Sequence, residues 1–468
     1  MENNTQLKEM IRSMVIDILQ GQKQEMASSQ PIKQAPRGQV EPGVFDTVDE
    51  AIQAAKAAQA RFEDCTLATR EKVIADIRAA MRPRVQELAQ KTVDETGMGR
   101  VADKVLKLNL TLNKTPGVED LVTECETGDN GMTLYELSAY GVIGAITPST
   151  NPAETLICNS IGMLAAGNAI FFSVHPGAKN LSRELVSELN QVIAKSIGIE
   201  NLIVTLREPS IESAQEMMLH PDVSLLVVTG GPGVVKQALQ SGKKVIGAGA
   251  GNPPAFVDET ADIKKAAQDI VLGASLDNNI LCIAEKSVVA MRQIEPQLVQ
   301  EMVKAGCILV ENQQDIQRLV DLTVLPNGTP NKKFVGKNAS VILDAAHIPY
   351  NGDPRLIIMR APKNHPFAVI EMLMPILPVV TVDSFDEGLD VCLMLEAGLH
   401  HTATMHSLNM ERLNRMARKM KTSIFVKNGP SYAGLGFSGE GTTTFTIATP
   451  TGESTTSARS FARRRRCC

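Results

Sequence analysis

The cysteine at position 282 lies in a stretch whose residue types could perform nucleophilic chemistry. The stretch, DNNILCIAEK at residues 277–286, contains no histidine, and the pair Glu285–Lys286 closes it. Cys282 could be a core residue, a metal ligand or a nucleophile. A thiolate attacks a carbonyl carbon and keeps the captured group as a thioester. An ordinary thiol, with a pKa of about 8.5, is mostly protonated at neutral pH, so a nucleophilic Cys282 needs dipoles or a cation nearby. Lys286 is near in sequence.

A second candidate is Asn151, in the stretch ITPSTNPAET at residues 146–155. Two prolines, Pro148 and Pro152, bracket this asparagine directly after an apolar run that predicts a strand. Proline rings fix the backbone nearby and would present the amide rigidly. A rigid amide donor is what an oxyanion hole requires. An ordinary Asx-type turn is the other interpretation.

Glycines follow another predicted strand in SLLVVTGGPGVVKQAL, residues 224–239. Gly230, Gly231 and Gly233 form the turn, and a helix begins after them. Free backbone N–H groups and the helix dipole make such a turn a fair phosphate cradle, although glycine turns also occur for steric reasons alone. The next glycine stretch, residues 245–256, has Asn252 in place of the last glycine of a dinucleotide fingerprint and indicates a turn.

The elements that must position these residues alternate between strands and helices, which predicts parallel sheets with crossover helices and an α/β class. At 468 residues the chain is too long for one simple core, so two or three lobes are expected. Helical spacing is found at residues 50–61, 180–196, 261–272 and 408–420. Short β-rich apolar runs predict strands at residues 141–147, 169–174, 202–206, 224–229, 287–291, 356–359, 378–382 and 423–427.

Composition argues against several other classes of protein. The net charge of −5 disfavours general nucleic-acid binding, and no apolar run approaches the roughly 20 residues of a membrane helix. The cysteines are scattered without a CxxC pair, which is typical of reduced thiols in a cytoplasmic compartment. His400, His401 and His406 lack a chelating spacing, so no metal site is predicted. Three cysteines in apolar contexts are expected in the core: Cys158, Cys307 and Cys392.

Six motifs occur in a specific order along the chain: TPSTNP, TGGPG, GAGAGNPP, DNNILCIAEK, EMLMPILPVV and TSIFVKNGPSYAGLG. This order resembles that of the aldehyde dehydrogenase superfamily. More narrowly, the chain resembles the coenzyme-A-acylating aldehyde dehydrogenases of bacterial microcompartments, which act on propanal or acetaldehyde. The likeness runs from about residue 44 to 466. It implies the aldehyde dehydrogenase fold, with a dinucleotide-binding domain, a catalytic domain and a small β oligomerisation element.

The resemblance assigns roles to individual residues. It makes Cys282 the nucleophile, with the Asn151 amide and the backbone N–H of Cys282 as oxyanion donors. His175–Pro176 stands where many members have a Lys-Pro pair at the adenosine ribose, and Glu371 matches the glutamate that holds the nicotinamide ribose. No basic residue suited to a 2′-phosphate is evident near His175, although the choice between NAD and NADP stays open. The residues implied in binding NAD are Pro148, Ser149, His175, Pro176, Thr229, Gly230, Gly231 and Glu371.

The acceptor of the acyl group is inferred from a missing base. Ala248 occupies the place of the glutamate that activates water in hydrolytic aldehyde dehydrogenases. A methyl group accepts no proton, so the acyl-enzyme needs a nucleophile that ionises by itself, and coenzyme A is expected. A hydrolytic enzyme with a base elsewhere, such as Glu285, and a non-catalytic dinucleotide-binding scaffold remain alternatives. Propanal and acetaldehyde differ by one methylene, worth about 1–3 kcal/mol, and are not separated.

The two ends of the chain suggest partners. Residues 1–20 have the spacing of an amphipathic helix, and residues 21–43 are typical of a flexible linker. The helix is either a general partner-binding element or, as the resemblance favours, an encapsulation peptide for a microcompartment shell protein. The second interpretation places the enzyme in the lumen of a cytoplasmic bacterial microcompartment. The arginine run at 463–466 is expected in a solvated tail, with attraction of coenzyme A phosphates as the alternative.

The domain boundaries follow from the resemblance. The dinucleotide-binding domain is expected at residues 44–120 plus 141–250, and the catalytic domain at residues 251–427. Residues 121–140 plus 428–468 are expected to form the oligomerisation element of a dimer or tetramer. Related chains usually continue past the arginine run, and a truncated element is one interpretation of the end at Cys468.

Overall fold

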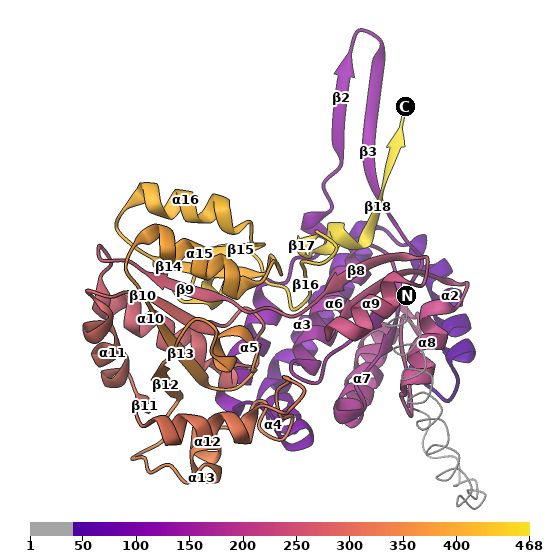
Figure 1. Ribbon diagram of the computed structural model, residues 1–468. Coiled ribbons are helices and arrows are strands. Elements are labelled where there is room, and N and C mark those ends of the chain that lie inside the picture. The colour runs from indigo at the N-terminus through magenta and orange to yellow at the C-terminus, as the bar shows by residue number, and fades with distance from the viewer. Residues whose placement is uncertain (1–40) are drawn as a thin grey trace, which may run out of the picture. The chain divides into compact units, whose positions relative to one another are not determined.

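The computed structural model describes residues 41–468 (Figure 1). The predicted helix at 1–20 and nearly all of the predicted linker at 21–43 lie outside the described residues. Every strand predicted from the sequence is present, with boundaries within two residues of the expected ones. Two fully parallel sheets result, so the predicted α/β class is confirmed. No helix among residues 41–468 is both long and apolar enough to cross a bilayer.

The first sheet has six strands in the order β1-β6-β5-β4-β7-β8. From β4 the chain places β5 and β6 on one side and later β7 and β8 on the other, so the strand order reverses between β4 and β7. Ligands of parallel sheets bind outside the carboxyl ends of the strands at such a reversal. The strands are β1 (Val44–Phe45), β4 (Val142–Ile146), β5 (Ala169–Ser173), β6 (Ile203–Leu206), β7 (Val223–Thr229) and β8 (Lys244–Ala248).

The central strands of this sheet are buried on both faces, as continuous apolar runs in parallel sheets require. Their side chains share one core with the apolar faces of the surrounding helices. Helix α6 is buried along its whole length, because it combines apolar residues with few charges. The helices are α2 (Val48–Glu63), α3 (Leu67–Met81), α4 (Val85–Thr96), α5 (Val101–Lys114), α6 (Pro152–Ala165), α7 (Lys179–Ile197), α8 (Ile211–Leu219) and α9 (Pro232–Leu239).

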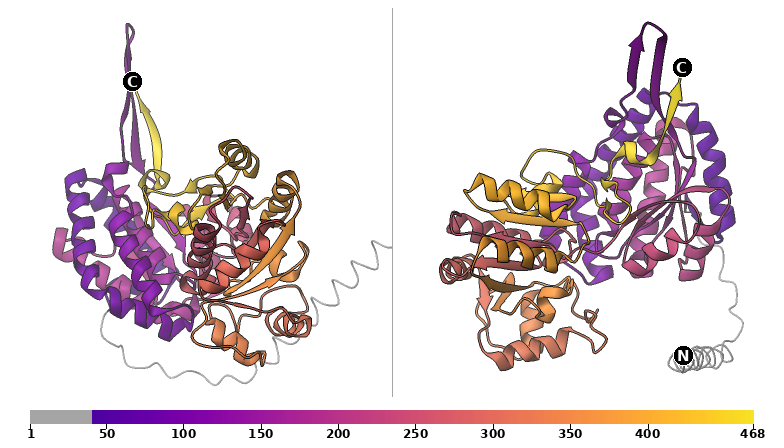
Figure 2. Two further views of the ribbon diagram at one scale, coloured as in Figure 1. Left: turned by 90° about the vertical axis from the view of Figure 1, so that its left-hand side faces the viewer. Right: turned by 45° about the horizontal axis from the view of Figure 1, so that its top comes forward.

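The second sheet has seven parallel strands in the order β11-β12-β13-β10-β9-β14-β15 and a core of its own. Figure 2 shows its orange elements gathered apart from the indigo and magenta elements of the first sheet. The strands are β9 (Pro254–Val257), β10 (Ser287–Met291), β11 (Cys307–Leu309), β12 (Leu356–Arg360), β13 (Ile376–Val382), β14 (Thr402–His406) and β15 (Ile424–Lys427). The helices are α10 (Ile263–Ser275), α11 (Glu295–Lys304), α12 (Gln313–Thr323), α13 (Ala339–Ala345), α14 (Pro366–Val369), α15 (Phe385–Glu396) and α16 (Met410–Met420).

A third, antiparallel sheet joins a projecting hairpin to the C-terminal strand (Figure 1). The hairpin consists of β2 (Glu124–Gly128) and β3 (Gly131–Ala139), and β18 (Ala462–Cys467) pairs along β3. The arginine run is solvent-exposed, as expected, but it forms a strand and not a tail. These arginines form β18 because they can stack on and pair with β3 and β2: the Arg464 guanidinium lies 4.0 Å from the Tyr135 ring centre and pairs with Glu124.

Candidate active site

The predicted dinucleotide-binding residues lie at the carboxyl edge of the first sheet. Pro148 and Ser149 follow β4, His175 and Pro176 follow β5, and the turn 229–231 follows β7. These three strands are neighbours, and all of them are parallel. The topology therefore brings together seven of the eight residues expected to bind NAD, next to the reversal of strand order. Glu371 alone comes from the second sheet, where it precedes β13.

The glycine turn after β7 is open. Gly231 is the N-terminal cap of α9, and Pro232 occupies the first helical position. A Cβ atom added at Gly231 or Gly233 would meet no heavy atom within 4 Å. Exposed N–H groups at a helix N-terminus fit a pyrophosphate, so the backbone here is suited to a dinucleotide.

His175 has a backbone hydrogen-bond partner and lies within the influence of a lysine charge. Its Nδ1 accepts a hydrogen bond from the Gly177 N–H at 3.0 Å. Burial, together with the charge of Lys332, lowers the pKa of His175. Lys332, which is distant in sequence, thus adds a positive charge to the surroundings of His175.

The turn before Cys282 has an unusual backbone. Asp277, Asn278 and Asn279 have φ values of 50°, 56° and 65°, three consecutive left-handed residues without a glycine. Such a conformation costs roughly 1–2 kcal/mol for an ordinary residue and less for Asp and Asn, whose short side chains form local hydrogen bonds. The two asparagines and the aspartate of the motif are thus the residue types that this turn requires.

The side chains of the turn offset this strain by bonding it to the rest of the chain. Asp277 Oδ1 accepts from the Arg100 N–H at 2.8 Å, and Asn278 Oδ1 accepts from Arg100 Nε at 3.1 Å. Asn278 Nδ2 donates to the Gly336 carbonyl at 2.9 Å, and Asn279 Nδ2 donates to the Ala274 carbonyl at 2.7 Å. All three side chains are buried. The segment that leads to the cysteine is consequently held in one conformation.

Cys282 itself is partly buried and packs against an apolar cluster. Burial raises the pKa of Cys282 to about 12, the nearby Glu371 carboxylate adds to the rise, and the Lys286 ammonium opposes it. Without ligands the side chain is therefore a thiol at neutral pH. The thiolate is favoured by the Lys286 charge and by the backbone N–H groups of Cys282 and Ile283.

Lys286 is fully enclosed by the turn. Its Nζ donates to the Asn279 carbonyl at 2.8 Å, to Asn279 Oδ1 at 2.6 Å and to the Leu281 carbonyl at 2.9 Å. Burial lowers the pKa of Lys286 to about 8, while the Glu371, Cys282 and Glu285 charges act to raise it. The lysine therefore carries a charge at neutral pH and binds three oxygens of the turn at residues 277–286, called the catalytic turn below.

The loop before β9, which contains Gly251, lies against Cys282 and Glu371. Gly251 donates its N–H to Glu371 Oε1 at 3.1 Å. A Cβ atom at Gly251 would lie 2.6 Å from the Cys282 carbonyl oxygen and 2.8 Å from the His401 ring, so only glycine fits. Burial raises the pKa of Glu371. Cys282, Glu371 and Lys286 are thus brought together at the amino ends of the strands of the second sheet.

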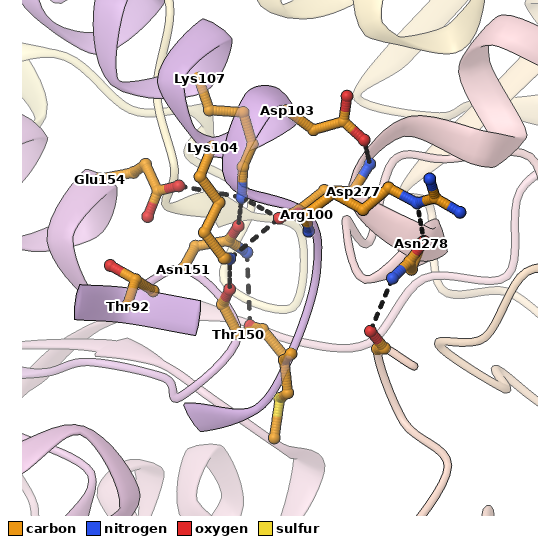
Figure 3. A network of polar contacts seen from close by, with 12 residues as sticks. Thr92, Arg100, Asp103, Lys104, Lys107, Thr150, Asn151, Glu154, Asp277 and Asn278 are labelled. Carbon is orange, nitrogen blue, oxygen red and sulfur yellow. Dashed lines mark hydrogen bonds and ion pairs between the residues drawn. The ribbon is translucent and has the colours of Figure 1, made fainter. Parts of the chain in front are cut away.

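Asn151 caps α6 and belongs to a buried network of charges (Figure 3). Lys107 Nζ contacts Asn151 Oδ1 at 2.5 Å, Asp277 Oδ2 at 2.5 Å and Glu154 Oε1 at 2.9 Å. Lys104 Nζ bonds Asp277 Oδ2 at 3.0 Å. Lys107 therefore connects Asn151, at the carboxyl edge of the first sheet, to the turn that carries Cys282.

The charges of this network determine its protonation. Burial acts to lower the pKa of Lys107, but Asp277 and Glu154 outweigh it and raise that pKa. Burial acts to raise the pKa of Asp277, but the two lysines outweigh it and lower that pKa. Burial and the adjacent Lys107 charge lower the pKa of Lys104. Lys107 and Asp277 thus form a charged pair.

Both carboxylate oxygens of Glu285, the alternative base for hydrolysis, are occupied by hydrogen bonds. Its Oε1 accepts from the Ser431 N–H at 2.8 Å, and its Oε2 accepts from the Ser431 hydroxyl at 2.7 Å. Burial raises the pKa of Glu285 to about 7. Ala248, at the end of β8, is buried and offers no base either.

His401 directly precedes β14, and His406 is its last residue. His401 is buried, its Nδ1 lies 2.9 Å from the Thr402 hydroxyl, and its Nε2 has no partner among residues 41–468. Burial lowers the pKa of His401 and of His406 to about 4, so both rings are neutral. Within the described residues, no three Cys, His, Asp or Glu side chains converge as metal ligands. Cys158, Cys307 and Cys392 are buried, as predicted.

Sequence reasoning missed the lysines of α5. Lys104 and Lys107 are 0% and 1% exposed at the side chain. A signal was present, because they share one helical stripe with the buried residues Leu108 and Thr111. A lysine on an apolar stripe is normally expected to extend its long stem and place its ammonium in water. The acidic partners that keep Lys104 and Lys107 buried, Glu154 and Asp277, are distant in sequence.

Known proteins resemble this chain over nearly its full length. Propanal dehydrogenase (CoA-propanoylating) of Salmonella typhimurium is 51% identical, over 99% of this chain and 98% of that protein. The acetylating acetaldehyde dehydrogenase of the same organism is 47% identical, over 91% of this chain and 92% of its own.

Solved structures agree with these relatives. The Rhodopseudomonas palustris propionaldehyde dehydrogenase, with bound CoA and an acylated cysteine, superposes with a TM-score of 0.90 at 49% identity, covering 92% of this chain and 98% of that one. The propionaldehyde dehydrogenase of the Clostridium phytofermentans fucose utilisation bacterial microcompartment gives 0.90 at 47% identity, covering 91% and 98%. The predicted fold and the predicted acylating class are confirmed by these matches. The profile of the aldehyde dehydrogenase family matches residues 18–446, and the chain belongs to this family.

Proposed function

We propose that this chain oxidises a short aliphatic aldehyde with NAD and transfers the acyl group to coenzyme A, through a thioester on Cys282. The observation that carries the proposal is that neither of the two positions expected to supply a carboxylate base for water does so. Ala248 stands where hydrolytic members have their glutamate, and both Glu285 oxygens are bonded to Ser431. The relatives that are CoA-acylating enzymes support the same conclusion.

The chemistry proceeds in two stages at one sulfur atom. The Cys282 thiol releases its proton to solvent, and the thiolate forms a C–S bond to the aldehyde carbonyl carbon, whose oxygen becomes an oxyanion. Asn151 Nδ2 and the Cys282 N–H donate to that oxygen. Collapse of the oxyanion breaks the C–H bond and leaves a thioester, while NAD, when bound, supplies the hydride acceptor. The coenzyme A thiolate then attacks the thioester carbon, and the C–S bond to Cys282 breaks.

The residues around Cys282 support a short apolar substrate. The cysteine packs against a cluster to which α5, α6 and the C-terminal segment contribute. Its members include Leu110, Cys158, Phe445 and Ile447. These side chains offer no charged partner to a second polar group on the aldehyde, so propanal or acetaldehyde fits best.

The decisive experiment is NADH formation from propanal at pH 8, with and without coenzyme A, for the natural chain and for Cys282→Ala. We expect steady turnover only with coenzyme A and none from the variant. Without coenzyme A, at most one NADH should form per active site, because the thioester is not hydrolysed.

Two results would contradict the proposal. Steady turnover without coenzyme A would mean that water reaches the thioester and that the argument from Ala248 is wrong. No NADH from the natural chain with propanal or acetaldehyde, and with NAD or NADP, would favour a non-catalytic scaffold. Retained binding of NADH by Cys282→Ala, followed by fluorescence, controls for misfolding.

We also propose that residues 1–20 bind a microcompartment shell protein and place the enzyme in the lumen. The amphipathic spacing of this segment and the microcompartment source of one solved relative support the proposal. A fusion of residues 1–20 to a fluorescent protein should form puncta in cells that make compartments. A Leu7→Asp, Ile11→Asp version should be diffuse, and diffuse fluorescence from both would refute the proposal.

We propose the domain division given by the sequence, with residues 121–140 and 428–468 forming contacts in a homo-oligomer. The support is the projecting β2–β3 hairpin with β18, whose outer residues are exposed. Sedimentation should show a dimer or tetramer for the described chain and a smaller species once the hairpin residues 124–139 are replaced by a short linker. An unchanged oligomer would refute this assignment.

A further inference from the structure

Two amides are the oxyanion donors of the proposed reaction, and a buried ammonium holds the carbonyl end of each. The Asn151 amide has its Oδ1 against Lys107 Nζ at 2.5 Å. The peptide between Leu281 and Cys282 has its carbonyl oxygen against Lys286 Nζ at 2.9 Å. Both lysines are buried, and they come from different elements, α5 and the catalytic turn.

The lysine fixes which end of the Asn151 amide faces the substrate. An ammonium group has only donors, so the amide atom it contacts must be the oxygen. Nδ2 is therefore turned away from Lys107, and it donates only one longer bond, of 3.3 Å, to the Thr150 hydroxyl. An amide nitrogen carries two protons, so one proton is left for a ligand.

The same argument applies to the Cys282 backbone. No cis peptide bond occurs in the described residues, so the Leu281 carbonyl and the Cys282 N–H point in opposite directions. The carbonyl accepts from Lys286 Nζ and from the Ala284 N–H at 3.1 Å. No backbone carbonyl among residues 41–468 accepts from the Cys282 N–H, which interacts with the sulfur of its own residue. The lysine thus fixes the peptide plane, and no backbone carbonyl competes for its N–H.

We propose that Lys107 and Lys286 are paired positioning residues, each of which orients and polarises one amide of the oxyanion hole from behind. A cation at the carbonyl end of an amide draws electron density toward the oxygen and makes the N–H a stronger donor, as in cooperative hydrogen-bond chains. The proposal rests on the function proposed above.

The network around Lys107 gives this device a second property. Asp277 Oδ2 accepts from both Lys107 and Lys104, and Asp277 begins the turn that carries Cys282. Lys107 therefore joins the two donors mechanically, because it bonds Asn151 on one side and the catalytic turn on the other (Figure 3). One buried ammonium thus links Asn151 to the first residue of the turn that carries Cys282.

The first test replaces Lys107 with methionine and measures the rate of the first NADH turnover after rapid mixing. Loss of one donor in other oxyanion holes lowers the rate by about a hundred- to a thousandfold. Lys107→Met keeps Asn151 but removes its support, so a fall of about ten- to a hundredfold is expected, with the KM for NAD unchanged. Lys104→Met is the matched control. It also removes a buried lysine bonded to Asp277, but one that bonds the Thr150 carbonyl instead of a donor amide, and should lower the rate less than about threefold.

A double-mutant cycle separates positioning from a general structural role. If Lys107 acts mainly through Asn151, then Lys107→Met should lower the rate at least about fivefold less in an Asn151→Ala background than in the natural chain, and the remaining loss passes through Asp277. Full additivity, or equal rate losses in Lys104→Met and Lys107→Met, would overturn the assignment. If Lys107→Met does not fold, Lys107→Met with Glu154→Gln keeps the network neutral and is judged by the same criteria.

Lys286 is tested by comparing two rates in Lys286→Met. Alkylation of Cys282 by iodoacetamide reports the thiolate, and the first NADH turnover reports the thiolate and the oxyanion donors together. We expect the turnover rate to fall at least about tenfold more than the alkylation rate. Equal falls would mean that Lys286 acts on the sulfur alone and would overturn the Lys286 half. A natural chain without NADH formation refutes the proposed function, whereas an active natural chain with unaffected lysine variants refutes only this inference.

Discussion

The two turns that build the site differ in how firmly the rest of the chain holds them. The glycine turn after β7 has open space around Gly231 and Gly233. The catalytic turn, residues 277–286, is buried, contains three left-handed residues, and is bonded through its side chains to α5, α10 and the segment near Gly336. One turn exposes backbone, and the other encloses it.

This difference matches the tasks proposed for the two turns. A dinucleotide that enters and leaves in every cycle needs accessible N–H groups and few fixed contacts. Oxyanion donors stabilise the reaction only if they are oriented before charge develops, because reorientation during the step would cancel the gain. Backbone strain at functional sites persists only where the surroundings enforce it, and the three strained residues of this turn are buried and hydrogen-bonded to other segments. Four predictions test the contrast.

The largest effect is expected from Asp277→Asn. The amide keeps the shape but leaves Lys104 and Lys107 without their shared carboxylate, and breaking a buried ion pair costs about 3–5 kcal/mol. Asp353→Asn is the control, because Asp353 also pairs with a residue of this region, Arg100, but is 68% exposed at the side chain. It should cost less than about 1 kcal/mol. Urea unfolding of both variants measures the difference, and equal costs would mean that the catalytic turn does not depend on the network.

The stabilisation by Asp277 should decrease at low pH. The folded-state pKa of Asp277 is lowered, so its contribution is present above the unfolded pKa of about 3.9 and is lost as pH falls through the folded value. The stability gap between the natural chain and Asp277→Asn should therefore narrow below about pH 4. A gap that stays constant down to pH 3 would contradict the ionised carboxylate.

The second prediction concerns Gly251→Ala. The added methyl would lie 2.6 Å from the Cys282 carbonyl oxygen, so the catalytic turn or the β9 loop must shift. We expect kcat to fall by about a hundredfold, since small displacements of oriented groups have such effects. Gly249→Ala is the control, because its methyl meets only a Pro450 ring carbon at 3.1 Å. Equal kcat values for the two variants would show that the turn tolerates displacement.

Much of the fold follows from the sequence, and the site follows only in part. The strands could be predicted because strands buried on both faces require continuous apolar runs, and such runs are found at residues 142–146 and 287–291. The resemblance supplied Cys282 and Asn151. Lys107 was not predicted, because its salt bridge joins it to Asp277, 170 positions away, and nothing local marks that partner. Lys286 was noted beside Cys282, but its contact with the Leu281 carbonyl was not predicted.

The strand formed by the arginine run and the Lys332 charge near His175 were not predicted, for a related reason. A run of four arginines is typical of a solvated segment, but the partners that make it a strand, Tyr135 and Glu136, lie more than 300 residues earlier. Lys332 approaches His175 from the second half of the chain. In each case the local sequence predicts only how such a residue usually behaves, whereas contacts with residues distant in sequence determine its actual surroundings.

The third prediction uses the pKa of Cys282. Burial and then the Glu371 carboxylate raise that pKa to about 12, so alkylation by iodoacetamide should accelerate about tenfold per pH unit between pH 7 and 10. Glu371→Gln removes the negative charge, stabilises the thiolate, and should move the profile to lower pH. Glu285→Gln is the control, because that buried carboxylate bonds Ser431 and is not among the groups that shift the Cys282 pKa. A shift to higher pH in Glu371→Gln would mean that Glu371 accepts the thiol proton instead of opposing the thiolate.

The smallest effect is expected from Gly231→Ala. Gly231 has a φ of −65°, which alanine adopts freely, and its methyl would project into open space, so folding stability should not change. If NAD lies against this backbone, the methyl crowds the cofactor alone, and the KM for NAD should rise about two- to fivefold with kcat unchanged. The comparison with Gly251→Ala is then complete: the same chemical change raises KM at the open turn and lowers kcat at the enclosed one. A kcat loss of about tenfold in Gly231→Ala would mean that the glycine turn also orients the reacting groups, and the division of tasks between the two turns would be wrong.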